Sequence, residues 1–211
     1  MSSPRLTDMA RTGLTLLALL AAAGCAGPGP ARDDASAATG TIEPAAGEAV
    51  TREVPPAALT QFEQATAVMA AGDFTDAELR FKEFVLLYPD YPGAWTNLAI
   101  IHVANGNDEA ARDALDTALQ LDPDYPVALN QLGMLLRRNG NFLEAEAAYM
   151  KAVTVSPDYA LAHYNLGVLN ELYLQRLEVA LQHFETYQSL VGEDKQVEKW
   201  ISDLRRRVAA D

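Results

Sequence analysis

The sequence contains very little cysteine and lacks a long hydrophobic segment near its start. Its one cysteine, Cys25, excludes an internal disulfide, and a lone cysteine outside any domain indicates modification rather than folding. The apolar run at residues 14–23 has ten residues, whereas a membrane-spanning helix needs about 20. We therefore expect neither a disulfide framework nor a membrane-spanning helix from this run.

Basic residues are scarce. The chain has 16 Lys and Arg against 29 Asp and Glu, for a formal net charge of -13. Residues 57–192 carry eighteen acidic and seven basic residues, which gives -11 for this part. Nucleic-acid binding needs a basic face, so this composition argues against a nucleic-acid partner. It permits a basic protein partner, and equally a solvated acidic surface.

Catalytic and metal-binding motifs are also missing. His102, His163 and His183 form no His-Glu-x-x-His pattern, and no cysteine can join them. The sequence has no glycine-rich phosphate loop that opens a helix and no Gly-x-Ser-x-Gly turn. We therefore expect no enzyme activity, no cofactor and no metal site, and we expect His102 and His163 to be packing residues.

The segment 1–24 has the features of a secretory signal sequence. Arg5 and Arg11 precede the apolar run, whose length suits a signal-peptide core. The segment Ala22-Ala23-Gly24-Cys25 resembles the lipobox of bacterial lipoproteins, although Ala22 stands where most members have leucine, so ordinary cleavage after Ala23 stays open. The resemblance implies that Cys25 is lipidated. The next residue is Ala26 and not aspartate, which by the same resemblance implies an outer-membrane anchor facing the periplasm.

Residues 25–56 join this lipidated cysteine to the rest of the chain. Prolines, glycines, alanines and scattered charges make up the segment, and no hydrophobic period appears in it. Such a composition predicts a disordered tether. A flexible coil of this length reaches roughly 30 Å, which would hold the following domain close to a membrane surface.

A regular repeat dominates the remainder of the chain. Pro-Asp-Tyr occurs at 89–91, 123–125 and 157–159, at a constant spacing. We call residues at the same place in successive repeats a column. The main columns are small residues (Ala65, Ala99, Gly133, Gly167), glycines (Gly72, Gly106, Gly140), alanines (Ala77, Ala111, Ala145) and large apolar residues (Phe81, Leu115, Tyr149). The small residues suit close helix approach, the glycines suit helix ends, and the prolines stop helices.

These columns and their spacing together resemble the tetratricopeptide repeat (TPR), a helix–turn–helix unit of about 34 residues. The resemblance implies an all-α fold, a right-handed α-solenoid of helix pairs over residues 57–192. Its repeats are predicted at 58–91, 92–125, 126–159 and 160–191. The fourth has Leu174 in the glycine column and its alanine one residue late, at Ala180, so we predict a one-residue insertion near residues 173–177. Residues 193–208 predict an amphipathic capping helix.

In this family the first helix of each pair lines the concave side of the stack. The residues predicted to bind a partner there are Phe62, Thr66, Thr96, Ile100, Asn130, Met134, Arg137, Tyr164 and Val168. They form a mostly apolar groove for an extended or helical peptide. Lysine is absent from these columns, which argues against the carboxylate clamp of some chaperone-binding members. For Phe62, Met134 and Tyr164, packing against the tether or the cap is the alternative.

The sequence therefore predicts a non-catalytic adaptor of the bacterial cell envelope, with a protein or peptide partner and a lipid anchor in the membrane. Two narrower functions stay open. One is a pilotin-like factor that helps an outer-membrane secretin to assemble, which the lipoprotein-plus-repeat layout resembles. The other is a scaffold for cell-wall enzymes. The partner, the oligomeric state and the choice between the concave and convex faces are not predicted.

Overall fold

The computed structural model describes residues 55–210 and contains helices without strands in that range. The predicted signal sequence, Cys25 and all but the last two residues of the predicted tether lie outside the described residues. The helices are α1 Pro56–Ala70, α2 Phe74–Leu87, α3 Pro92–Ala104, α4 Asp108–Leu121, α5 Pro126–Arg138, α6 Phe142–Val155, α7 Ala160–Leu169, the π-helix η2 Asn170–Leu174, α8 Leu177–Val191 and α9 Lys195–Val208.

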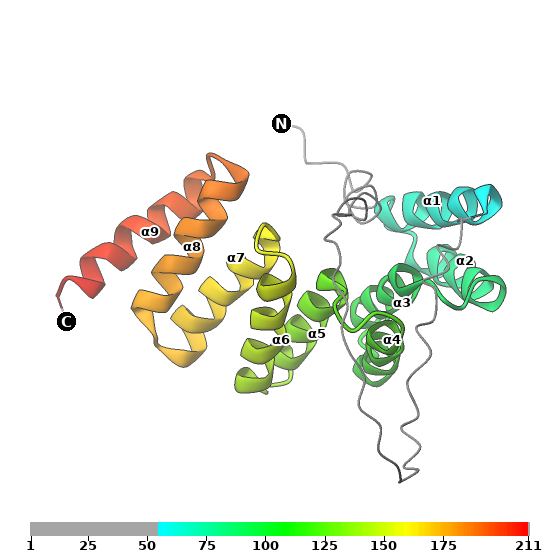
Figure 1. The fold of residues 1–211 in the computed structure, drawn as a ribbon, viewed down its shortest axis with the longest axis horizontal. Helices are drawn as coiled ribbons and strands as arrows, with labels where there is room; N and C mark the ends of the chain where they lie inside the picture. The colour runs from blue at the N-terminus through cyan, green and yellow to red at the C-terminus, as the bar shows by residue number, and fades with distance from the viewer. Residues whose placement is uncertain (1–54, 211) are drawn as a thin grey trace, which may run out of the picture. The chain divides into compact units, whose positions relative to one another are not determined.

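Consecutive helices pack in pairs along the chain, as the cyan-to-red series in Figure 1 shows. Within each repeat the first and second helices pack together, and each second helix also packs on the first helix of the following repeat. The first helices α3, α5 and α7 are neighbours as well. The predicted all-α solenoid is confirmed.

Glycine closes the first helix of three repeats. Gly72, Gly106 and Gly140 have φ values of 87°, 75° and 79°, and a Cβ placed on any of them would meet nothing within 4 Å. The glycine is therefore required for its left-handed backbone and not for space. The next residue starts the second helix, where Asp73 and Asn107 accept hydrogen bonds from Asp76 and Ala110.

Close packing explains the column of small residues inside the first helices. A Cβ on Gly133 would lie 2.5 Å from Cε1 of Tyr149, and one on Gly167 would lie 2.7 Å from Cδ1 of Phe184. Both rings are completely buried. The aromatic ring of the second helix thus lies directly on the backbone of the first, which a side chain at the glycine would prevent.

The fourth repeat departs from the others at the predicted insertion. The extra residue widens the end of the first helix into the π-helix η2, and Gln175 follows with a φ of 55°. Asn170 is fully buried, where its amide donates to the Leu166 carbonyl (3.0 Å) and its own backbone carbonyl accepts from the Arg176 amide (2.9 Å). Gln175 therefore adopts the left-handed conformation that glycine has in the other repeats, and Asn170 supports the wider turn.

Ion pairs and hydrogen bonds connect each repeat to the next. Asp108 pairs with Arg138 (3.3 Å), and Glu146 pairs with Arg176 (2.7 Å). The turn prolines also serve as acceptors, because Pro89 accepts from the Trp95 indole at 2.8 Å. Exposed pairs of this kind contribute only about 0–1 kcal/mol each, so they fix the geometry of the junctions more than their stability.

The helix α9 takes the place that the first helix of a fifth repeat would occupy. Two contacts show this: the Trp200 ring lies 6.1 Å from the Tyr164 ring, and Arg207 pairs with Glu171 at 2.8 Å. The partners are seven residues apart both on α9 and on α7 with its continuation η2, so α9 runs parallel to α7. Its apolar residues Val197, Ile201 and Leu204 are buried.

Candidate functional site

The residues predicted to bind a partner lie on one stripe of each first helix, but the structure buries some of them. Thr96 and Asn130 are each only 1% exposed. The prediction that these two contact a partner is therefore corrected. Adjacent first helices approach so closely that this column forms part of the helix–helix contact.

Asn130 belongs to a buried polar link between repeats. The Asn165 amide donates to the Asn130 Oδ1 at 2.9 Å, and both side chains are buried. The Asn130 amide lies 3.8 Å from the Met134 sulfur. Buried polar groups need partners, so this pair fixes how α7 lies on α5. Asn165 therefore has a structural role between repeats, with another asparagine as its partner.

The two aromatic residues predicted to bind a partner, Phe62 and Tyr164, mainly pack against other rings of the protein. Phe62 lies edge-on against Phe81 and Phe84, with ring centroids 5.7 and 5.6 Å away. Tyr164 packs against Tyr187 and Trp200, as well as Phe184. For Tyr164 the alternative, packing against the cap, is what the structure shows, and each ring keeps only partial exposure.

The other predicted residues remain accessible. Met134 is 38% exposed, while Thr66, Ile100, Arg137 and Val168 are half-buried. The Thr66 hydroxyl donates to the carbonyl of its own helix four residues back, at 2.8 Å. The apolar members and Arg137 are therefore the ones that can contact another molecule.

The sequence reasoning missed further residues on the same stripe, one turn closer to each helix start. Leu59 and Leu161 are 51% and 46% exposed, and Val127 is half-buried. Residues at spacings of three and seven share a helix face, so the series 161, 164 and 168 contained the signal. We call the accessible set the first-helix surface: Leu59, Ile100, Val103, Val127, Met134, Arg137, Leu161 and Val168.

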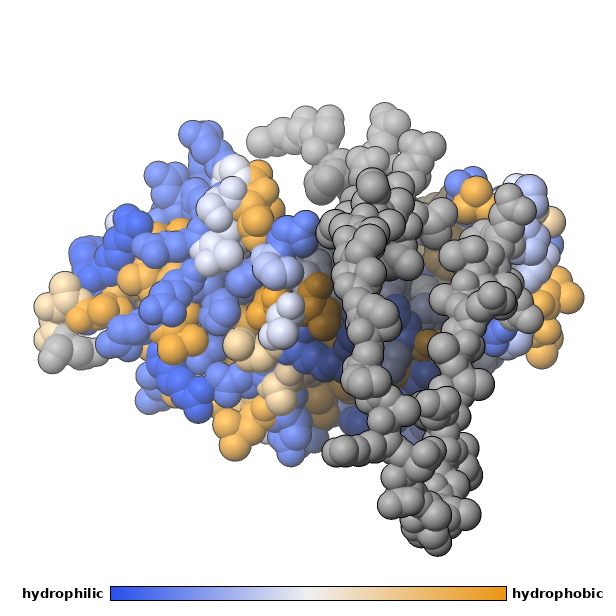
Figure 2. Space-filling view, viewed as in Figure 1, coloured by the Kyte–Doolittle hydropathy of each residue, from blue (hydrophilic) through white to orange (hydrophobic). Residues whose placement is uncertain are grey.

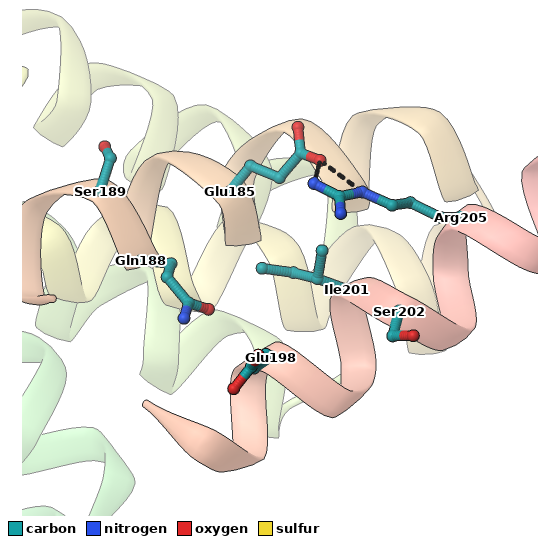
Figure 3. Close-up of a pocket in the computed structure, with 7 residues that line it drawn as sticks. All are labelled: Glu185, Gln188, Ser189, Glu198, Ile201, Ser202 and Arg205. Atoms are coloured by element: carbon teal, nitrogen blue, oxygen red, sulfur yellow. Dashed lines mark hydrogen bonds and ion pairs between the residues drawn. The ribbon is translucent and has the colours of Figure 1, made fainter. Parts of the chain in front are cut away.

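A hollow lies between α8 and α9, with a volume of about 550 Å³ (Figure 3). Its lining is Glu185, Gln188, Ser189, Glu198, Ile201, Ser202 and Arg205. The α9 residues are those that would face the second helix of a fifth repeat, but they are mostly polar, and Arg205 pairs with Glu185 at 2.7 Å. The lining therefore suits the water-exposed end of a stack.

In the described part of the chain, no three His, Cys, Asp or Glu side chains are grouped to hold a metal ion. Burial raises the pKa of Tyr149 and of Tyr159 to about 12, which keeps both neutral. None of the helices in residues 55–210 is long and apolar enough to cross a membrane.

The histidines that the sequence assigned to packing have structural partners. Nε2 of His163 lies 3.1 Å from the Pro157 carbonyl, and its Nδ1 lies 3.1 Å from Nδ1 of His183. Because a carbonyl only accepts, Nε2 of His163 carries the proton and Nδ1 accepts from His183. Trp95 makes the equivalent bond to Pro89 two repeats earlier. Trp95 and His163 therefore link the second and fourth repeats to their preceding turns.

The tetratricopeptide repeat family model matches residues 62–126 and 130–194, more than half of the chain. The chain belongs to the tetratricopeptide repeat family. No curated protein sequence matches it. TPR proteins are non-catalytic scaffolds for protein interactions, and their domains bind protein or peptide partners.

Solved TPR structures resemble the chain at low sequence identity. PilF of Pseudomonas aeruginosa is 20% identical, with a TM-score of 0.66 over 73% of this chain and 70% of PilF. A thermophilic TPR protein of Thermus thermophilus is 22% identical, with a TM-score of 0.62 over 70% of this chain and 80% of that one. The first TPR domain of RPAP3, solved with the HSP90 peptide SRMEEVD, is 20% identical, with a TM-score of 0.52 over 56% and 95%. At these identities the similarities establish the fold alone.

Proposed function

We propose that this TPR protein is a non-catalytic adaptor of the bacterial cell envelope that binds a protein partner through its first-helix surface. The observation that carries this is the accessible apolar stripe on neighbouring first helices, including Met134 at 38% and Leu161 at 46% exposure. The RPAP3 domain supports peptide binding as a function of this fold. Apolar side chains left in water at repeated positions favour a partner that covers them.

Exposed apolar residues also occur on the second helices, so the binding surface needs a direct test. On the face in Figure 2, hydrophobic residues form separate orange patches among hydrophilic blue ones. Leu143, on α6 outside the first-helix surface, is 64% exposed. It provides a matched control for the first-helix residues.

We expect the double substitution Met134→Glu and Leu161→Glu to reduce partner binding at least tenfold. Each buried apolar contact contributes about 1.5–3 kcal/mol, and a tenfold change in affinity corresponds to about 1.4 kcal/mol. The measurement is quantitative crosslinking in cells of the full chain, followed by mass spectrometry. Leu143→Glu should leave the crosslinked partner unchanged. If Leu143→Glu reduces the crosslinking and the double substitution does not, the partner binds the second helices instead.

The envelope location rests on the sequence before the described residues, where Cys25 follows Ala22-Ala23-Gly24. We propose that lipidation of Cys25 anchors the protein, with the outer membrane as the destination. A diacylglycerol and an acyl chain together exceed the two signals that stable anchoring requires.

Substituting Cys25→Ser should abolish lipid labelling and release the protein from membranes into the soluble fraction. The measurement is metabolic labelling with an alkyne palmitate, combined with membrane fractionation. A serine substitution that leaves labelling and fractionation unchanged would contradict the anchor, whereas export without labelling in the parent chain would favour ordinary cleavage after Ala23.

A pilotin-like role in secretin assembly is the second candidate. The fold similarity to PilF, with a TM-score of 0.66 over 73% of this chain, favours it over the cell-wall scaffold. Deleting the protein should then lower the amount of assembled secretin multimer in the outer membrane. Normal multimer levels in the deletion strain would reject this role and leave the general adaptor function intact.

A further inference from the structure

Arg137 is the only lysine or arginine in residues 57–192 with no ion pair or hydrogen bond to another described residue. The other six of that range, Arg80, Lys82, Arg112, Arg138, Lys151 and Arg176, each form an ion pair. Arg137 is half-buried and is the charged member of the first-helix surface. A partly exposed guanidinium that no protein group pairs with can form hydrogen bonds with a ligand.

The cap explains why Arg137 has no partner within the stack. Glu171 occupies the same column in the following repeat, so the repeat alone would place it beside Arg137. It pairs instead with Arg207 of α9 at 2.8 Å. The next residue, Arg138, points to the preceding repeat, where it pairs with Asp108 and donates to the Val103 carbonyl at 3.1 Å. These contacts leave Arg137 available.

The column of Arg137 is apolar on the α3 side, whereas on the other side it holds Glu171, which is paired with Arg207. Met134 lies one turn earlier on α5, Val103 occupies the same column on α3, and Val168 belongs to α7. Since α5 packs against both α3 and α7, the first-helix surface continues past Arg137 in both directions. A bound segment would therefore also continue past it, which favours an internal side chain over a chain end as the partner of Arg137.

We propose that the first-helix surface binds a peptide segment with apolar side chains around one internal aspartate or glutamate, whose carboxylate pairs with Arg137. This rests on the proposed function of that surface. The planar guanidinium fork suits a carboxylate, and charge-assisted hydrogen bonds of this kind are stronger than neutral ones. One carboxylate at one position sets the register, while the apolar contacts provide most of the affinity.

The test uses the full chain as bait for a random twelve-residue peptide library displayed without free C-termini. Enriched peptides are then synthesised, and their affinities are measured by fluorescence anisotropy. We expect the enriched sequences to carry an acidic residue flanked by apolar ones, and replacement of that acid by its amide to weaken binding about tenfold. With Arg137→Gln the acid and the amide should bind equally. Arg112→Gln, which removes the same charge from an ion pair with Asp116, should preserve the tenfold difference.

The outcomes distinguish the pairing of Arg137 with a carboxylate from the proposed binding function of the first-helix surface. Enriched peptides without an acidic residue, or an acid preference that survives Arg137→Gln, would overturn the pairing while leaving the surface as the binding site. Binding that depends on a free C-terminal carboxylate in the synthesised peptides would overturn the internal position. Absence of enrichment, or binding unaffected by Met134→Glu, would overturn both the inference and the proposed binding surface.

Discussion

Replacing Phe184 by alanine is expected to destabilise the protein by about 3–5 kcal/mol, the usual cost of removing a fully buried phenylalanine. The Phe184 ring is 0% exposed and lies on the Gly167 backbone. It also contacts Tyr164 and Trp200, with ring centroids 6.0 and 5.6 Å away. The substitution therefore opens a cavity where α7, α8 and α9 meet. Native proteins have only about 5–15 kcal/mol of stability, so this loss is large.

The loss of stability caused by Phe184→Ala should also be confined to the end of the stack. Repeat stacks are stabilised by each repeat and by its interfaces with its neighbours, so a defect in the last repeat need not unfold the first. Urea unfolding measures the total loss, and hydrogen exchange resolves where protection is lost. We expect amides of α7–α9 to lose protection while those of α3 and α4 keep it.

Leu87→Ala is the matched control, because Leu87 is 64% exposed and should cost less than about 0.5 kcal/mol. A loss below about 1 kcal/mol for Phe184→Ala would contradict the packing role assigned to this ring. A uniform loss of protection over all helices would contradict the local unfolding, and would show that the stack unfolds as one unit.

The repeat and its turns could be predicted from the sequence because they depend on local backbone chemistry. Gly72, Gly106 and Gly140 each have the positive φ that the glycine column predicted. The insertion in the fourth repeat was expected in the turn near residues 173–177, and the structure places it at the end of the first helix, in the π-helix Asn170–Leu174. Its form could not be predicted, since an extra residue fits either a longer loop or a wider helical turn. The buried Asn170, with its bonds to Leu166 and Arg176, selects the π-helix.

The binding surface was harder to predict because accessibility depends on the distance between neighbouring first helices. A helical stripe indicates which side a residue lies on, but not how deeply the next helix covers it. Thr96 and Asn130 share the stripe of Met134 and yet are 1% exposed, while Met134 is 38% exposed. The availability of Arg137 was likewise invisible in the sequence, because it follows from the contact of Glu171 with the cap residue Arg207.

The second large expected effect is a pH-dependent stability, which follows from the contact between His163 and His183. Burial, helped by the nearby charge of His163, lowers the pKa of His183 to about 4, against about 6.5 for an unfolded histidine. The folded state thus favours neutral His183. Its contribution to stability is complete above about pH 6.5 and is lost as the pH falls from there toward 4.

The size of this loss is limited because His183 is only partly buried. We expect it to reach no more than about 2 kcal/mol after allowance for solvent screening. The measurement is the free energy of unfolding in urea at intervals between pH 7 and pH 4. Carboxylates also titrate near the lower end of this range, so the wild-type curve alone does not isolate the histidine.

Comparison with His183→Gln isolates the histidine, because glutamine can still donate to Nδ1 of His163 but does not titrate. The difference in unfolding free energy between the two proteins should then change between pH 6.5 and 4, because the wild type loses the contribution of His183 and the variant has no titrating group there to lose. A constant difference between wild type and His183→Gln would mean that His183 titrates alike in the folded and unfolded chains, and that the histidine contact does not select a protonation state.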